Sequence, residues 1–298
     1  MAGIQSLEDN LSAPVAPALL IGNGVNRYGN TDSSSWEDLL DSLAHKQGMN
    51  LDKSARAAMS NTEFFDILDL TRPKESRDVL QKEFFGRMKS WRPGPQHALL
   101  VNWAKRHQAP IITVNFDENL SNSVDVRFIR QKEGFTDYYP WRSYFADEPI
   151  SDAKTSFAIW HAHGMARYFR SIRLGLTHYM GSVHRARDWV YNKNGIRRQA
   201  KSHSGNWPGN GTWLQVFFFC PIVIIGFGFS KDETFFRWLF LERARLHKLK
   251  PDWSSPAWFV DTGSVENQSR RLFLEKLGIN YIEMPSYDSI YDAAAWTH

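Results

Sequence analysis

The feature of this sequence that most constrains its fold is an alternation between short apolar runs and segments with helical periodicity. Apolar runs bounded by turn residues are typical of buried strands, and here they lie at residues 18–21, 110–114, 156–161, 216–225, 257–260 and 280–284. Helical patterns lie at residues 35–46, 62–70, 77–89, 96–107, 231–247 and 267–277. This alternation predicts an α/β protein with a Rossmann-like parallel sheet and helices on both faces.

Start and stop signals support three of these helices. Ser35 and Ser230 each precede a first turn with two acidic residues, which is typical of a capped helix start. Gly278 follows the pattern that ends at residue 277, and it is expected to stop that helix.

Composition favours a soluble, cytoplasmic protein. Hydrophobic residues make up 42% of the chain and charged residues 23%, the balance of a globular domain. The run 216–225 is too short to span a bilayer and contains Pro221, so we expect no membrane contact. The first residues lack the pattern of a signal peptide, and Cys220, the single cysteine, allows no internal disulfide. We therefore expect a cytoplasmic location.

Two regions depart from the alternation, and we expect both to be insertions within one domain that spans residues 1–298. Residues 47–92 are mostly helical and are expected to form a small subdomain. Residues 165–213 are expected to form a basic insertion or lid, because long insertions between strands often cover a ligand site. Between residues 167 and 201 this segment holds one acid, Asp188, and nine basic residues: Arg167, Arg170, Arg173, Arg185, Arg187, Lys193, Arg197, Arg198 and Lys201. It is either a solvated surface or a contact for a partner such as nucleic acid.

The first apolar run leads into the sequence GNGVN at residues 22–26. After the first strand of an α/β sheet, a glycine-rich turn lets backbone amides approach a pyrophosphate. The stretch lacks the third glycine of the dinucleotide fingerprint and also the Lys and Ser or Thr of a P-loop. It is therefore either a nucleotide-binding turn or a tight corner that requires small residues.

Polar residues follow two further runs. Asn115 and Asp117 come after the run 110–114, where they either cap the next helix or hold a polar ligand. His161 and His163 end the next run, and an extended chain would place both on one face of the strand. Because the carboxyl ends of parallel strands meet at one edge, we expect these side chains to share a crevice.

Four stretches stand in order along the chain: LLIGNGVN, GPQHALLVNWAKRHQAPIITVNFDENL, IWHAHG and VIIGFGFSKDETFFRWLF. They resemble the nucleotide-binding motifs of the sirtuin superfamily, specifically its bacterial SIR2-like branch. The resemblance covers about residues 18–245. It implies a single SIR2-like domain that binds NAD at the carboxyl ends of the strands.

By position, the resemblance implies that His163 is the catalytic histidine and that Asn115 and Asp117 contact NAD. The loop against the pyrophosphate and ribose matches Gly22, Gly24, Val25 and Asn26. The later loop, on the adenosine side, matches Gly226, Gly228 and Ser230. Deacylating sirtuins differ from this chain at Asn23 and Asn26, and their four-cysteine zinc module is excluded here, which argues against protein deacetylation.

NAD cleavage remains as the predicted chemistry. Breaking the bond between nicotinamide and ribose creates an oxocarbenium-like centre, so the protein must orient the ribose and deprotonate a hydroxyl or a water. Imidazole suits that proton transfer near neutral pH, which makes His163 the predicted general base. Asn115 is predicted to hold the ribose hydroxyls and the attacking water, and Asp117 the nicotinamide amide or its loop. We predict an NAD+ hydrolase (NADase) that needs no metal.

The resemblance further implies that this activity depletes cellular NAD+ during phage infection, as abortive-infection defence. It also implies control through a homo-oligomer or through a partner such as an ATPase or an Argonaute-type protein. Two alternatives remain open. One is a catalytically silent nucleotide-binding module that regulates a partner, and the other is a metal-dependent hydrolase with His161 and His163 as ligands.

Overall fold

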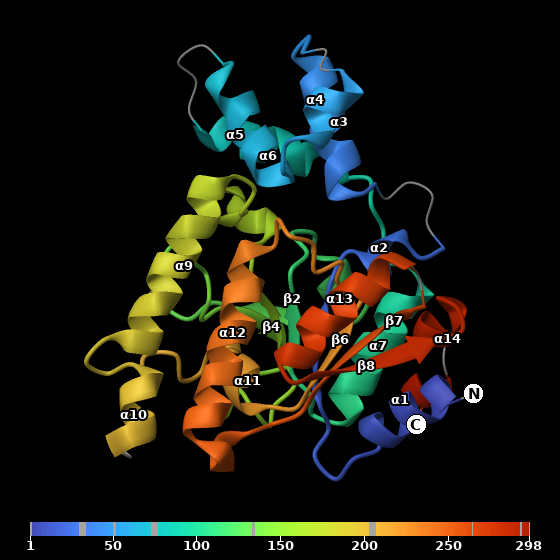
Figure 1. The fold of residues 1–298 in the computed structure, drawn as a ribbon, viewed down its shortest axis with the longest axis vertical. Coiled ribbons are helices and arrows are strands. Elements are labelled where there is room, and N and C mark those ends of the chain that lie inside the picture. Colours follow the sequence, from blue (N-terminus) through green and yellow to red (C-terminus); the bar gives the residue numbers. More distant parts are fainter. Residues whose placement is uncertain are drawn as a thin grey trace.

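The computed structural model describes residues 2–29, 34–49, 52–72, 77–132, 135–202, 207–263, 265–292 and 294–297. These residues form an α/β fold, with a mostly parallel sheet between two layers of helices and a further group of helices above the carboxyl ends of the strands (Figure 1). The predicted fold class is confirmed.

Eight strands of the described chain form one sheet: β1 (Ala18–Ile21), β2 (Ile111–Thr113), β3 (Arg127–Ile129), β4 (Tyr144–Ala146), β5 (Ile159–His161), β6 (Ile222–Ile225), β7 (Ala257–Thr262) and β8 (Ile279–Met284). Their order is β3-β4-β5-β2-β1-β6-β7-β8. The strands from β5 to β8 in that order all pair in parallel, whereas β4 is antiparallel to both of its neighbours. The six parallel strands thus have the Rossmann order 3-2-1-4-5-6, whose topological switch point lies between β1 and β6.

The α-helices of the described residues are α1 (Ala2–Leu11), α2 (Gly24–Arg27), α3 (Trp36–Lys46), α4 (Lys53–Ala57), α5 (Asn61–Leu70), α6 (Arg77–Met88), α7 (Pro95–Arg106), α8 (Asn119–Asn122), α9 (Leu176–Tyr191), α10 (Ile196–Ser202), α11 (Trp213–Phe219), α12 (Thr234–Leu249), α13 (Val265–Lys276) and α14 (Asp288–Tyr291). Short 3-10 helices lie at η1 (Ala166–Ser171), η2 (Pro251–Trp253) and η3 (Ala294–Trp296). Ser35 caps α3 as predicted, because its hydroxyl accepts from the Asp38 amide and the Asp38 carboxylate accepts from the Ser35 amide.

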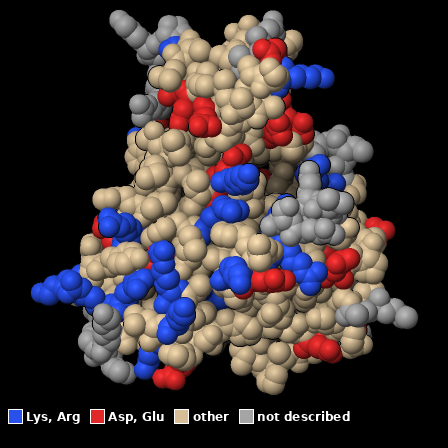
Figure 2. All heavy atoms as spheres, viewed as in Figure 1, with Lys and Arg blue, Asp and Glu red and all other residues tan. Residues whose placement is uncertain are grey.

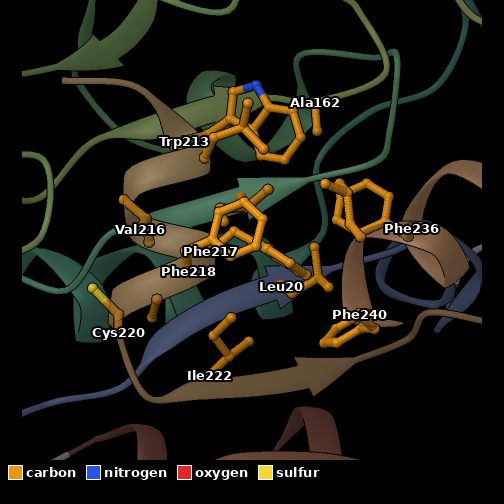
Figure 3. Packing of buried hydrophobic residues seen from close by; sticks show 14 of the residues in the cluster. Leu20, Ala162, Trp213, Val216, Phe217, Phe218, Cys220, Ile222, Phe236 and Phe240 are labelled. Atoms are coloured by element: carbon orange, nitrogen blue, oxygen red, sulfur yellow. The ribbon is translucent and has the colours of Figure 1, made fainter. Parts of the chain in front are cut away.

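The strands bury side chains on both faces, which explains why they read as continuous apolar runs. Leu20 and Ile112 pack in the core beneath α9, α11 and α12, whereas Leu19 and Ile111 pack in the core beneath α1 and α7. Figure 3 shows the first core, where Phe217 and Phe218 of α11 lie between the sheet and α12. The ring centroid of Phe217 is 4.8 Å from that of Phe240. Aromatic residues are therefore concentrated in the core, where each buries a large apolar area.

Three expectations are corrected. The run 216–225 is not one strand: Thr212 caps α11, the helix includes residues 216–219, and β6 begins only after Pro221. The antiparallel strands β3 and β4, which lie at one end of the sheet, were not expected, because each is only three residues long. The helix after Ser230 begins at Thr234, three residues later than predicted, because Glu233 accepts from the Phe236 amide and is itself the cap.

A helical subdomain is formed by α3 to α6, which stand apart above the sheet (Figure 1). Leu40, Phe65 and Phe84 belong to its own apolar core, to which Ile172 and Leu174 also contribute. The segment 47–92, except for residues 50, 51 and 73–76 outside the described residues, accounts for α4 to α6, and α3 precedes it.

The helical subdomain is tied to the rest of the protein by polar contacts. The Asp66 carboxylate accepts from the Leu176 amide at 2.9 Å, and the Gln81 side chain donates to the Ile172 carbonyl at 2.6 Å. These contacts hold it over the carboxyl ends of the strands.

The basic segment 165–213 contains η1, α9 and α10, while residues 203–206 and the side chain of Lys201 lie outside the described part. Helix α9 packs beside α12 and also contacts α5 of the helical subdomain. No helix among the described residues is both long enough and apolar enough to cross a bilayer.

Candidate functional site

A cavity of about 870 Å³ lies at the carboxyl edge of the sheet, at the switch point between β1 and β6. This volume is within the range of small-molecule sites. Its floor comes from the ends of β1, β2, β6 and β7, and its roof from aromatic residues of the helical subdomain and the loop that follows it: Trp36, Phe84 and Trp91. The open end of a Rossmann-like sheet therefore has an aromatic cover.

The glycine turn packs directly against the turn that follows β6. A Cβ on Gly24 would lie 2.6 Å from the Gly226 Cα, and one on Gly22 would lie 2.5 Å from the Gly226 carbonyl oxygen. Gly226 has a φ of 61°, which favours glycine. Gly228, by contrast, faces open space. Glycine at positions 22, 24 and 226 is therefore required by the close approach of two turns.

The amides of the glycine turn are largely used within the protein. The amides of Gly22 and Gly24 donate to the carbonyls of Ile225 and Gly226 at 3.0 and 2.8 Å. Those of Val25 and Asn26 donate to carbonyls inside the turn. The structure thus favours the tight-corner interpretation for these four amides. Arg27 is the Lys or Arg residue among those that line the cavity, and its exposed side chain has no ion pair to another described residue.

Asn26 is buried beneath the turn and does not line the cavity. Its amide group donates to the Asp117 carboxylate at 2.8 Å and to the Asn23 side chain at 3.0 Å. Its carbonyl oxygen accepts from Asn119 at 3.0 Å and from His97 Nε2 at 2.9 Å. We refer to Asn23, Asn26, His97, Asp117 and Asn119 as the turn network. Val25 is also buried, in the apolar core.

Two members of the turn network have shifted pKa values. His97 Nδ1 accepts from the Gly94 amide, so Nε2 carries the proton given to Asn26. Burial lowers the pKa of His97 to about 4. Burial also raises the pKa of Asp117, whose second oxygen accepts from the Asn119 amide at 3.0 Å. Asp117 reaches the cavity wall, but both of its oxygens already have partners in the protein.

Asn115 lines the same cavity at the end of β2. Its side-chain amide donates to the Gly22 carbonyl at 3.2 Å, which fixes the side chain beside the glycine turn. Seven of the predicted site residues line this cavity: Gly24, Asn115, Asp117, His163, Gly226, Gly228 and Ser230. Gly22, Val25, Asn26 and His161 do not line it.

His163 is a buried titratable group at the cavity wall, and one of its ring nitrogens has no hydrogen-bond partner among the described residues. Its Nε2 lies 2.9 Å from the Glu233 carboxylate, while Nδ1 is buried and has no hydrogen-bond partner among the described residues. A carboxylate accepts, so Nε2 carries the proton and Nδ1 has a free lone pair. Tyr179 also contacts Glu233, at 3.4 Å, and burial with the nearby carboxylate raises its pKa well above 10.0. The phenol therefore stays protonated.

The prediction that His161 and His163 share one face is wrong. Strand β5 ends at His161, and the chain turns before Gly164, which has a φ of 95°. His161 packs on Phe145 and donates from Nδ1 to the Asn115 carbonyl at 2.9 Å, whereas His163 packs on Phe236 of the opposite core. Burial lowers the pKa of His161. Among the described residues, no group of three or more His, Cys, Asp or Glu is arranged to hold a metal.

The sequence did not predict three residues that shape the site. Glu233 was expected only as an acid in the first turn after Ser230, Tyr179 as a candidate stacking group in the basic segment, and Arg27 only as part of the turn after the first apolar run. Glu233 lies 70 residues from His163, so no local pattern connects them. No protein family model matches the chain, and no match among curated proteins was found.

Proposed function

We propose that the cavity binds NAD+ and hydrolyses the bond between nicotinamide and ribose. The observation that carries this proposal is the pairing of His163 with Glu233 at the wall of a cavity located at the switch point of a Rossmann-like sheet. Ligands of such sheets bind at that point. The resemblance to SIR2-like proteins suggests the substrate, and the hydrogen bond between His163 and Glu233 supports the role of His163 as a base.

The proposed reaction needs one proton acceptor. The glycosidic bond breaks with its electron pair leaving on nicotinamide, which departs as a neutral molecule and leaves an oxocarbenium-like ribose. Water adds to that carbon, and His163 Nδ1 takes the proton. Glu233 holds the imidazole in the tautomer with Nδ1 unprotonated and stabilises the imidazolium that forms. The products are ADP-ribose, nicotinamide and a proton released to solvent.

The rest of the substrate would meet groups on the cavity wall. Because the turn amides are engaged, the pyrophosphate would pair with the Arg27 guanidinium, which suits a phosphate by charge and geometry. Asn115 would hold the ribose hydroxyls. The aromatic roof at Trp36 and Trp91 offers flat apolar surface to the bases.

Nicotinamide release from NAD+ by the purified chain tests the proposal. We expect release by the wild type, a loss of about 100-fold or more in His163→Ala, and a similar loss in Asn115→Ala. NAD+ binding is measured on the same samples by calorimetry. Binding retained in His163→Ala would show that the cavity is intact and that the chemical step was lost.

A second function is favoured by one observation. His163 Nδ1 is buried, and the turn amides are used internally, which suits a nucleotide-binding module that is catalytically silent. Such a module would bind NAD+ or ADP-ribose and release no nicotinamide, with or without a partner protein. The release assay separates the two functions.

The resemblance to SIR2-like proteins also suggests a role for this activity in the cell. We propose a cytoplasmic enzyme that depletes NAD+ in response to phage, held inactive until it assembles as a homo-oligomer or meets a partner such as an ATPase or an Argonaute-type protein. Cellular NAD+ measured after induction of wild type and His163→Ala tests this. An equal NAD+ level in both strains during phage infection would contradict it.

A further inference from the structure

The second half of α9 and the adjoining α10 present a surface with dense positive charge. We refer to it as the basic face, made of Arg142, Arg185, Arg187, Lys193, Arg197 and Arg198. Figure 2 shows Lys and Arg side chains gathered over the region that α9 and α10 occupy in Figure 1. This face lies on a different part of α9 from Tyr179, so it is separate from the cavity.

Two acidic groups lie near this face, Glu242 and Asp188. Glu242 is buried and accepts from Arg197 at 3.2 Å and from Arg245 at 2.6 Å. Asp188 lies 3.9 Å from His184. The exposed side chains of Arg187, Lys193 and Arg198, in contrast, have no ion pair within the described part of the chain. Their positive charge is uncompensated and faces solvent.

Aromatic rings are interleaved with these cations. The Arg185 guanidinium lies 5.0 Å from the ring centroid of Tyr139 and 5.4 Å from that of Trp189, and its Nε has no partner among the described residues. Tyr191, 38% exposed, has guanidinium groups at 5.8 Å (Arg187) and 5.2 Å (Arg197). Exposed rings beside arginines are the surface on which unpaired bases stack.

We propose that the basic face binds nucleic acid through its phosphate backbone, with Tyr191 available to stack on a base. Arginines outnumber lysines on it, and the guanidinium fork matches a phosphate better than an ammonium does. Apart from Arg142, the cations of this face come from the second half of α9, from α10 and from Lys193 between them, so several phosphates of one strand would each find a cation.

A membrane surface fits this face less well. Binding to a bilayer requires large apolar side chains beside the cations. Between residues 185 and 200, Tyr191 is the exposed large hydrophobic side chain, whereas Leu176 and Met180 lie near the other end of α9. The proposal does not depend on NAD chemistry at the cavity.

Fluorescence anisotropy with a labelled single-stranded oligonucleotide of about 20 nucleotides tests the proposal across a salt series. We expect the wild type to bind, with log K falling linearly with log salt. The triple variant Arg187→Glu, Lys193→Glu, Arg198→Glu should bind about 100-fold more weakly and lose about 2 to 3 units of salt slope. A duplex of the same sequence shows whether stacking on Tyr191 contributes.

The control variant carries the same charge change at exposed lysines on other elements, as Lys53→Glu, Lys89→Glu and Lys276→Glu. We expect it to bind within about threefold of the wild type, since long-range charge is screened by salt. The proposal is wrong if the wild type does not bind at low salt, or if both triple variants lose affinity equally. It is also wrong if vesicles of phosphatidylserine and phosphatidylcholine bind this face and the oligonucleotide does not.

Discussion

The cavity around His163 and the turn network meet at the same sheet edge, where Asn23 and Asp117 of the network reach the cavity wall, but the two regions use polar side chains in opposite ways. In the turn network, Asn26 and Asp117 satisfy their oxygens with protein donors. At the cavity, Glu233 fixes one nitrogen of His163 and leaves the other with a free lone pair. Groups that are saturated by the protein hold geometry, whereas a group with spare capacity is able to act on a ligand. The comparison therefore separates a reacting region from a supporting one.

The largest effect is expected where the reacting region depends on its carboxylate. One oxygen of Glu233 accepts from both His163 Nε2 and the Phe236 amide, so the amide oxygen of Glu233→Gln keeps both hydrogen bonds, but the negative charge that stabilises the imidazolium is lost. We expect kcat for nicotinamide release to fall about 100-fold or more with a much smaller change in KM. Glu233→Asp, which keeps the carboxylate, serves as the control. If Glu233→Gln kept the kcat of the wild type, the Glu233 carboxylate would have no role in the chemical step, and the distinction between the two regions would be wrong.

The contact between the two turns is tested by a matched pair of glycine substitutions. Gly24→Ala forces a Cβ to within 2.6 Å of the Gly226 Cα, whereas Gly228→Ala adds a Cβ in open space. We expect Gly24→Ala to lower the free energy of unfolding by about 3 kcal/mol, as overpacking does, and Gly228→Ala to change it by less than about 0.5 kcal/mol. Urea unfolding measures both. Equal effects would mean that the turns are not held by close packing.

In the supporting region, His97 should make the free energy of unfolding depend on pH. Because the folded-state pKa of His97 is about 4, below its ordinary value of 6.5, the unfolded chain binds more protons between these pH values. Stability is then full above pH 6.5 and declines as the pH falls toward 4.

At pH 5 the protonation of His97 should have lowered the free energy of unfolding by about 2 kcal/mol. His97→Gln lacks the titrating group, so its free energy of unfolding should decline less than that of the wild type between pH 7 and pH 5. An identical decline in both proteins would show that His97 does not contribute.

Much of the architecture follows from the sequence because it is locally encoded. The runs 18–21 and 257–260 become strands in β1 and β7 because apolar residues lie on both of their faces, and Ser35 with Asp38 encodes a helix start within four residues. The run 216–225 was assigned wrongly because the segment from Trp213 to Phe219, apolar except for Gln215, suits a buried helix as well as a strand. A short edge strand such as β3 forms because it pairs with β4, and no local sequence pattern predicts that pairing.

The site is predictable only in part. Asn115, Asp117 and His163 reach one cavity because parallel strand ends meet, which topology alone requires. Whether Asp117 is free or saturated depends on Asn26, 91 residues away, and the partner of His163 is 70 residues away. Such long-range pairs decide which groups react and which support the site. The sequence placed His161 and His163 on one face because it assumed that the strand continues, but the chain turns after His161.

The most direct test of that division compares the two histidines under one substitution. His161→Asn keeps an N–H near the position of Nδ1, which donates to the Asn115 carbonyl, whereas His163→Asn removes the proposed base. We predict nicotinamide release within about tenfold of the wild type in His161→Asn and a loss of about 100-fold or more in His163→Asn, with NAD+ binding kept in both. Loss of release in His161→Asn with full activity in His163→Asn would contradict the account.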